Sequence, residues 1–235
     1  MKRGRLFLVP NHLGGPVADV LPANLVHRIQ HIRYFIVEEI RSARRLLKAI
    51  GYETPFEEVV FELLNEHTSA ESLDKLIAPI AKGSDAALIS EAGLPAVADP
   101  GSDLVRKAHA LGVQVIPVSG PSSILMALMS SGLNGQNFAF TGYLPRENAD
   151  RQKRLRELEQ LNIRTGQTQL FMDAPYRNDQ VWQSAMECLK NDTLITIAAD
   201  ISTDREFIMT KTVGQWKDQR PPSLNKRPVM FALGR

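Results

Sequence analysis

The stretch GSDAALISEAGLPAVADPGSDLVRKAHALGVQVIPVSGPSS, residues 83–123, contains two short apolar segments that each run into a loop of Gly, Pro, Ser and acidic residues. The segments Ala86–Ile89 and Val113–Val118 are expected to be strands, with a helix over Asp103–Leu111 between them. In an open α/β sheet, the loops at the carboxyl ends of parallel strands hold small ligands. This stretch therefore predicts a binding site formed by the loops that follow the two strands.

Strands and helices alternate along the rest of the first half. Strands are expected at Leu6–Val9, Tyr34–Val37 and Glu58–Leu64, and helices at Pro22–His31, Ala43–Ile50 and Ser72–Ala81. Ser42 is expected to cap the second of these helices, because a serine before a helix can bind its free N–H groups. The alternation predicts an α/β domain whose mainly parallel sheet is covered on both faces.

The second half has more strands and fewer crossover helices, which predicts a second α/β domain with a mixed sheet. Strands are expected at Phe138–Thr141, Gln169–Met172, Leu194–Ala198, Glu206–Thr210 and Val229–Leu233, and helices at Ser122–Ser131, Arg151–Leu161 and Asp179–Leu189. We place the boundary after Val118, which gives domains over residues 1–118 and 119–235.

Composition narrows the class of protein. The chain has 235 residues, is 43% hydrophobic and carries 28 basic against 26 acidic residues, a net charge of +2 that is too small to indicate nucleic-acid binding by itself. One cysteine, Cys188, excludes an internal disulfide. No apolar run reaches the roughly 18 residues of a membrane span, and the apolar part of MKRGRLFLVP is too short for a signal peptide. We expect a soluble, cytoplasmic protein without membrane contact.

Several common motifs are absent. The chain has no G-x-G-x-x-G after its first strand, no G-x-x-x-x-G-K-[ST] and no H-E-x-x-H, so an ordinary dinucleotide fold, a P-loop NTPase and a zinc protease lose their main support. His27 and His31 are spaced i, i+4 but lack an evident third ligand, and we predict no metal site.

Eight turns together resemble one family. They read LFLVP (6–10), VEEIRSARRLLK (37–48), LLNEHTS (63–69), ISEAGLPAVADPG (89–101), SGPSSILMALMSSGL (119–133), FTGYLPRE (140–147), MDAPYR (172–177) and STDREF (202–207). Their order resembles that of the tetrapyrrole-methylase-like methyltransferases, and within that superfamily the branch that methylates a ribose 2′-hydroxyl of 16S ribosomal RNA.

The resemblance implies a homodimer that binds S-adenosylmethionine in a cleft between two α/β domains. The implied cofactor residues are Glu91, Gly93, Leu94, Pro95, Ser122, Ser123, Met172 and Pro175. Pro10 belongs to the same site and borders its methyl-acceptor side, and the implied catalytic residues are Glu39, Arg41 and Arg205.

Plainer interpretations stay open for some of these residues. Glu91 can cap a turn, Ser122 can cap the following helix, Met172 can be a core residue, and Asp99 can form an Asx-type turn. A structural ion pair is the alternative for Arg205 and its acidic neighbours.

Four departures from the ribosomal branch bear on the acceptor. The first loop reads PNHLGG where Pro-Thr-Pro-Ile-Gly-Asn is usual, Glu91 replaces an aspartate and Ile40 a threonine, and the sequence stops at Arg235 without the branch's C-terminal extension. A tetrapyrrole or other small-molecule acceptor, a non-catalytic relative and an unrelated phosphate-binding enzyme are therefore kept as alternatives.

A short basic segment bears on the same choice. It contains Arg146, Arg151, Lys153, Arg154 and Arg156. It is either a ridge that binds RNA phosphates or the solvated face of a charged helix.

Overall fold

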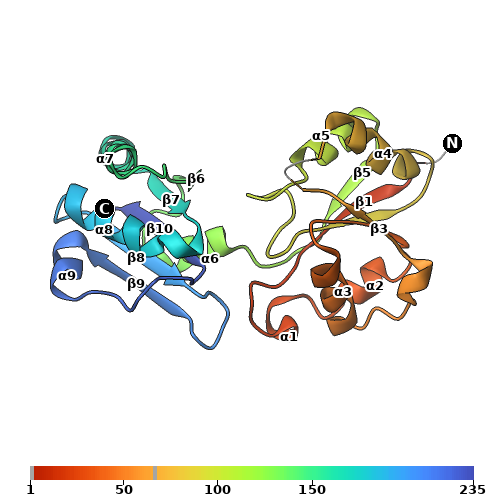
Figure 1. Ribbon diagram of the computed structural model, residues 1–235, viewed down its shortest axis with the longest axis horizontal. Coiled ribbons are helices and arrows are strands. Elements are labelled where there is room, and N and C mark those ends of the chain that lie inside the picture. The colour runs from red at the N-terminus through yellow and green to blue at the C-terminus, as the bar shows by residue number, and fades with distance from the viewer. Residues whose placement is uncertain (1–2, 66–67) are drawn as a thin grey trace. The chain divides into compact units, whose positions relative to one another are not determined.

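The computed structural model describes residues 3–65 and 68–235, and the chain divides into two compact units, Met1–Ser122 and Ser123–Arg235 (Figure 1). The predicted boundary after Val118 lies four residues before this division. Each unit contains one five-stranded sheet with its own helices. Two α/β units, the first with a parallel and the second with a mixed sheet, are confirmed.

The sheet of the first unit is entirely parallel, with the strand order β3-β2-β4-β1-β5. Its strands are β1 (Arg5–Val9), β2 (Tyr34–Val37), β3 (Val60–Leu63), β4 (Ala86–Ile89) and β5 (Gln114–Pro117). Every residue of β2 and β4 is buried, because strands in the middle of a parallel sheet are covered on both faces and consist of continuous apolar runs.

Alternate residues of these strands build two separate cores. Phe35 and Val37 of β2 pack with Leu47 on one face, whereas Ile36 packs with Ile80 on the other. The helices are α1 (Val17–Val20), α2 (Leu25–Ile29), α3 (Ile40–Ala49), α4 (Ala70–Ala81) and α5 (Ser102–Ala110), with a 3-10 turn, η1, at Phe56–Glu58. Residues of α2 and α3 join the first core and residues of α4 and α5 the second, so helices cover both faces of the sheet.

One predicted helix is shorter than expected. The segment 22–31 contains only α2, because the carbonyl of Pro22 accepts a hydrogen bond from the Leu25 N–H (2.9 Å) in a turn that precedes it. A helix over the whole segment was a wrong prediction.

The sheet of the second unit has the order β6-β7-β10-β8-β9 and is mixed, since β6 and β7 are parallel and the other pairs are antiparallel. Its strands are β6 (Phe138–Tyr143), β7 (Thr168–Met172), β8 (Leu194–Ala199), β9 (Phe207–Thr212) and β10 (Val229–Gly234). Its helices are α6 (Ser123–Ser131), α7 (Asn148–Thr165), α8 (Asn178–Cys188) and α9 (Val213–Asp218), with a 3-10 turn, η2, at Pro175–Arg177.

The core of this unit lies where α7, α8 and α9 meet the sheet. Leu158, Val181 and Trp216 from the three helices pack with Phe171 and Phe231, whose rings stack 5.5 Å apart. Helix α9 was not predicted from the sequence, although Thr212 and Gln215 form a capping box at its start, a motif that the local sequence contains.

Candidate active site

The loops predicted to hold a ligand meet at the carboxyl edge of the first unit's sheet. Because β1, β2, β4 and β5 are parallel, the loops after them begin at the same edge. Pro10 ends the first strand and is buried, Glu91 follows β4 and is exposed, and Pro121 lies in the loop after β5. The structure thus brings together segments that are more than a hundred positions apart in the sequence.

Asn11 joins the first two of these loops. The Asn11 N–H donates to the Gly93 carbonyl (2.8 Å), and the Gly93 N–H donates to the Asn11 carbonyl (3.1 Å). Its buried side chain donates to the carbonyls of Ser90 (3.1 Å) and Glu91 (2.8 Å). Sequence analysis missed this residue, and its only local signal was an asparagine directly after a strand.

Two glycines at this edge are required by the backbone. Gly93 has φ +70°, a left-handed conformation that glycine adopts without steric cost. Gly120 lies so close to Pro10 that a Cβ there would overlap the proline ring. The loops after β1 and β5 are therefore in direct contact, with the Pro10 ring against the Gly120 backbone.

The loop after β4 is held in an unusual conformation. Ala96 and Ala98 have φ of 65° and 60°, which non-glycine residues rarely adopt. Such residues cost free energy and cluster at ligand-binding and catalytic sites. Together with the half-buried Leu94 and the buried Pro95, they form a turn in which the Val97 N–H donates to the Leu94 carbonyl at 3.3 Å.

Three carboxylates lie at the same edge. The Glu91 N–H donates to Glu38 Oε2 at 3.2 Å. Burial and, to a lesser extent, the negative charges of Glu38 and Glu91 together raise the pKa of Asp99 to about 6, against a hydrogen bond with Ser90 that lowers it. Asp99 therefore shares an electrostatic environment with Glu38 and Glu91.

Glu39 has a structural role that the sequence analysis assigned to Ser42. Its carboxylate accepts hydrogen bonds from the N–H groups of Arg41 (2.8 Å) and Ser42 (2.6 Å) and so caps α3. The hydrogen bond from Arg41 lowers the pKa of Glu39. The prediction that Ser42 caps this helix was wrong, because the helix begins at Ile40 and Ser42 lies inside its first turn. The catalytic roles of Glu39 and of the exposed Arg41 stay predictions.

In the second unit, Met172 ends β7 and is half-buried, and the exposed Pro175 begins η2. Between them, Asp173 is fully buried, accepts a hydrogen bond from the Ala174 N–H (2.7 Å) and pairs with Arg177. Asp173 Oδ2 and two guanidinium nitrogens of Arg177 lack partners among the described residues. Asp173 was also missed, although the acid and the arginine stand four positions apart in the quoted MDAPYR.

The other predicted residues are placed as follows. Ser122 is buried directly before α6, whose first residue is the half-buried Ser123. The Arg205 side chain is 79% exposed, with its Nε 3.9 Å from Asp200, whereas Arg227 holds the same carboxylate at 2.7 Å. An exposed pair like that of Arg205 contributes little stability.

Two negative findings apply to residues 3–65 and 68–235. No set of three His, Cys, Asp or Glu residues in that part of the chain could hold a metal ion. The helices described there include none whose length and hydropathy would suit a membrane span.

Comparison with known proteins identifies the family. The family model of the Tetrapyrrole (Corrin/Porphyrin) Methylases matches residues 21–216. The chain belongs to this family. The carboxyl-edge loops, which were predicted from the strand pattern, also contain several of the motifs that carry the resemblance to this family.

Curated relatives match over most of the chain. A Pseudomonas aeruginosa protein named Ribosomal RNA small subunit methyltransferase I is 31% identical over 93% of this chain and 73% of its own length. Proteins of the same name from Xylella fastidiosa and Bacillus subtilis are 30% and 29% identical, over 98% and 90% of this chain and 80% and 68% of their own lengths.

A solved structure supports the fold. The methyltransferase CobJ superposes with a TM-score of 0.65 over 99% of this chain and 94% of its own, at 16% sequence identity. At that identity the likeness supports the tetrapyrrole methylase fold and nothing about the substrate.

Proposed function

We propose that this protein is an S-adenosylmethionine-dependent methyltransferase that acts on small-subunit ribosomal RNA, with a ribose 2′-hydroxyl as the acceptor. The similarity to relatives named Ribosomal RNA small subunit methyltransferase I over nine-tenths or more of the chain carries this proposal. The eight ordered motifs along the chain and the family match support it. Such an enzyme works where ribosomes assemble, so we place it in the cytoplasm.

The residues at the carboxyl edge fit the cofactor chemically. S-adenosylmethionine carries an ammonium and a sulfonium charge, and Glu38, Glu91 and Asp99 supply negative charge at this edge. Gly93 allows the left-handed turn after β4, and Gly120 allows the loop after β5 to approach Pro10, because neither carries a Cβ. In this proposal Glu91, Gly93, Leu94, Pro95 and the serines of the 122–123 turn hold the cofactor. Pro10, Met172 and Pro175 remain predicted contacts, testable by the same titrations.

When bound, the cofactor supplies an electrophilic methyl group. The protein has to align the acceptor, exclude water and remove the hydroxyl proton. Glu39 is engaged by two backbone N–H groups, so its first task is to fix α3 and the loop before it. Asp99, with a pKa of about 6, is the carboxylate at this edge best suited to accept a proton near neutral pH.

The test combines binding and product analysis. Calorimetric titration should give saturable S-adenosylmethionine binding at one site per chain. Small ribosomal subunits from a strain lacking the gene should gain one 2′-O-methylated nucleoside when they are incubated with the protein and S-adenosylmethionine. Mass spectrometry after digestion detects this nucleoside. Cofactor binding without any methyl transfer to RNA would instead support a small-molecule acceptor or a non-catalytic relative.

A further inference from the structure

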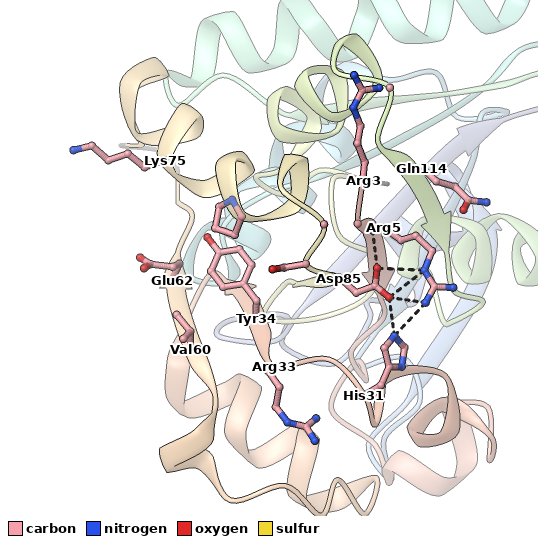
Figure 2. A pocket seen from close by; sticks show the side chains of 15 residues that line it. Arg3, Arg5, His31, Arg33, Tyr34, Val60, Glu62, Lys75, Asp85 and Gln114 are labelled. Atoms are coloured by element: carbon pink, nitrogen blue, oxygen red, sulfur yellow. Dashed lines mark hydrogen bonds and ion pairs between the residues drawn. The ribbon is translucent and has the colours of Figure 1, made fainter. Parts of the chain in front are cut away.

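A hollow lies at the opposite, amino edge of the first unit's sheet, away from the proposed site. It has a volume of about 1260 Å³ and is lined by residues in or near the first parts of all five strands and by Lys75 and Pro79 of α4 (Figure 2). Because the strands are parallel, this edge gathers their amino ends as the other gathers their carboxyl ends. The proposed methyl transfer uses none of these residues.

The lining of this hollow is predominantly cationic. Its basic residues are Arg3, Arg5, Arg33 and Lys75, with His31, and its acidic residues are Glu62 and Asp85.

One ion pair neutralises part of that charge. Asp85 accepts hydrogen bonds from the Arg5 N–H (2.8 Å) and guanidinium Nε (3.1 Å), and His31 Nε2 lies 2.9 Å from it (Figure 2). Burial raises the pKa of Asp85, but the hydrogen bonds from Arg5 and His31 bring it down to about 2. Arg5 is therefore balanced within the protein, which leaves three cations against Glu62.

A structural role explains only one of those three cations. Arg33 donates to the carbonyls of Gln30 (2.7 Å) and Ile32 (3.2 Å) just after α2, where positive charge is favourable. The side chains of Arg3 and Lys75 are exposed and have no hydrogen-bond or ion-pair partner in the part of the chain that the structure describes. Figure 2 shows Arg3, Arg33 and Lys75 on different sides of the hollow.

The surroundings exclude a built site for a single phosphate. Helices α4 and α5 end at this edge, so they present carbonyl groups here rather than the free N–H groups that bind phosphate at a helix start. The Tyr34 ring is buried and its hydroxyl donates to the Leu76 carbonyl (3.1 Å), so it offers no face for a base to stack on. What remains is a set of separated side-chain cations, which suits a polymer of phosphates.

We propose that this amino-edge hollow contacts the sugar–phosphate backbone of the RNA substrate and does not read its bases. The proposal rests on the function proposed above and adds a second RNA contact at the far edge of the sheet. It predicts binding that depends on salt and is independent of local sequence, because phosphate contacts release counterions and carry no base information.

The test compares two double charge reversals in the first unit. Arg3→Glu/Lys75→Glu alters the hollow, and Arg28→Glu/Lys48→Glu alters two exposed cations outside it. Affinity for 16S ribosomal RNA is measured by filter binding over a salt series. Relative to the control, we expect the first variant to bind RNA at least about tenfold more weakly, with a salt slope smaller by about 1.5.

A neutral variant, Arg3→Gln/Lys75→Gln, should show the same effects at smaller size, and calorimetry should show unchanged S-adenosylmethionine binding. Equal RNA affinity and slope in the hollow and control variants would overturn the proposal. So would unchanged RNA binding combined with lost binding of inorganic phosphate, which would assign the hollow to a small anion.

If wild type itself fails to methylate RNA, the proposed function fails. If wild type methylates RNA and the Arg3→Glu/Lys75→Glu variant binds RNA with the same affinity and salt slope as wild type, only the inference about the hollow fails.

Discussion

Glu91 is the residue through which the carboxyl-edge site can be tested most directly. It is exposed, and its N–H already binds Glu38. Glu91→Ala should weaken S-adenosylmethionine binding about tenfold or more, because a hydrogen bond to a charged ligand group is lost. Calorimetry measures this, with Glu57→Ala, an exposed glutamate in η1, as the matched control. An unchanged dissociation constant in the folded Glu91 variant would remove this residue from the site.

Asp99 gives the stability of the protein a pH dependence. Its folded pKa of about 6 lies above its ordinary value of 3.8, so the folded state binds its proton more tightly than the unfolded state. The free energy of unfolding should therefore fall as pH rises from about 4 to about 6. Asp99→Asn should remove this fall and be more stable than wild type at pH 7 by about 1–2 kcal/mol, allowing for solvent screening.

Urea unfolding of both proteins at pH 4, 5, 6 and 7 measures that difference. A gap between wild type and Asp99→Asn that does not change with pH would show that Asp99 titrates as it does in the unfolded chain.

At the scale of single elements, α3 depends on its cap. Glu39→Ala should lower the free energy of unfolding by about 1 kcal/mol, since two N–H groups lose their acceptor, and Ser42→Ala should change it little. Glu39→Ser restores a capping oxygen without the carboxylate and separates the two roles. If Glu39→Ser recovers stability but not methyl transfer, Glu39 is catalytic as the resemblance implies; recovery of both would leave only the cap.

Helix α7 contains most of the basic segment that was predicted as a possible RNA-binding ridge, and one of its arginines is not available for RNA. The Arg151 side chain is buried and donates to Ser184 Oγ (2.9 Å), the Arg146 carbonyl (2.7 Å) and Asn148 Oδ1 (3.2 Å), so it cannot bind phosphates. Lys153 and Arg156 are exposed on the same helix and line a shallow hollow.

Arg151→Ala should destabilise the protein by about 2–4 kcal/mol, because it leaves buried acceptors without a donor. Lys153→Glu/Arg156→Glu should leave thermal stability unchanged and weaken salt-dependent RNA binding. Thermal unfolding and filter binding distinguish the two variants. Normal RNA binding by the double variant would make α7 an ordinary solvated helix.

For the whole molecule, the resemblance predicts a homodimer. The protein exposes large apolar side chains on α6, among them Met129, whose side chain is 82% exposed. Light scattering at micromolar concentration should give twice the mass of one chain. A monomer mass would contradict the prediction.

The sequence by itself determined the elements whose signal is local. The short runs YFIV and AALI are apolar at every position, as expected of strands that are covered on both faces, and both strands were predicted with their observed bounds. The family was also determined at this level, since eight ordered turns specify it.

Only the tertiary structure decided features that depend on distant segments. The buried Arg151 side chain depends on a hydrogen bond to Ser184, which is 33 positions away. The Asn11 side chain donates to the carbonyl of Ser90, which is 79 positions away. The amino-edge hollow exists because the strand order β3-β2-β4-β1-β5 gathers cations from separate segments. A pattern in the sequence records which side chains are charged or apolar. Whether a charge faces solvent, a partner or another charge is determined by the packing of elements that are far apart in the chain.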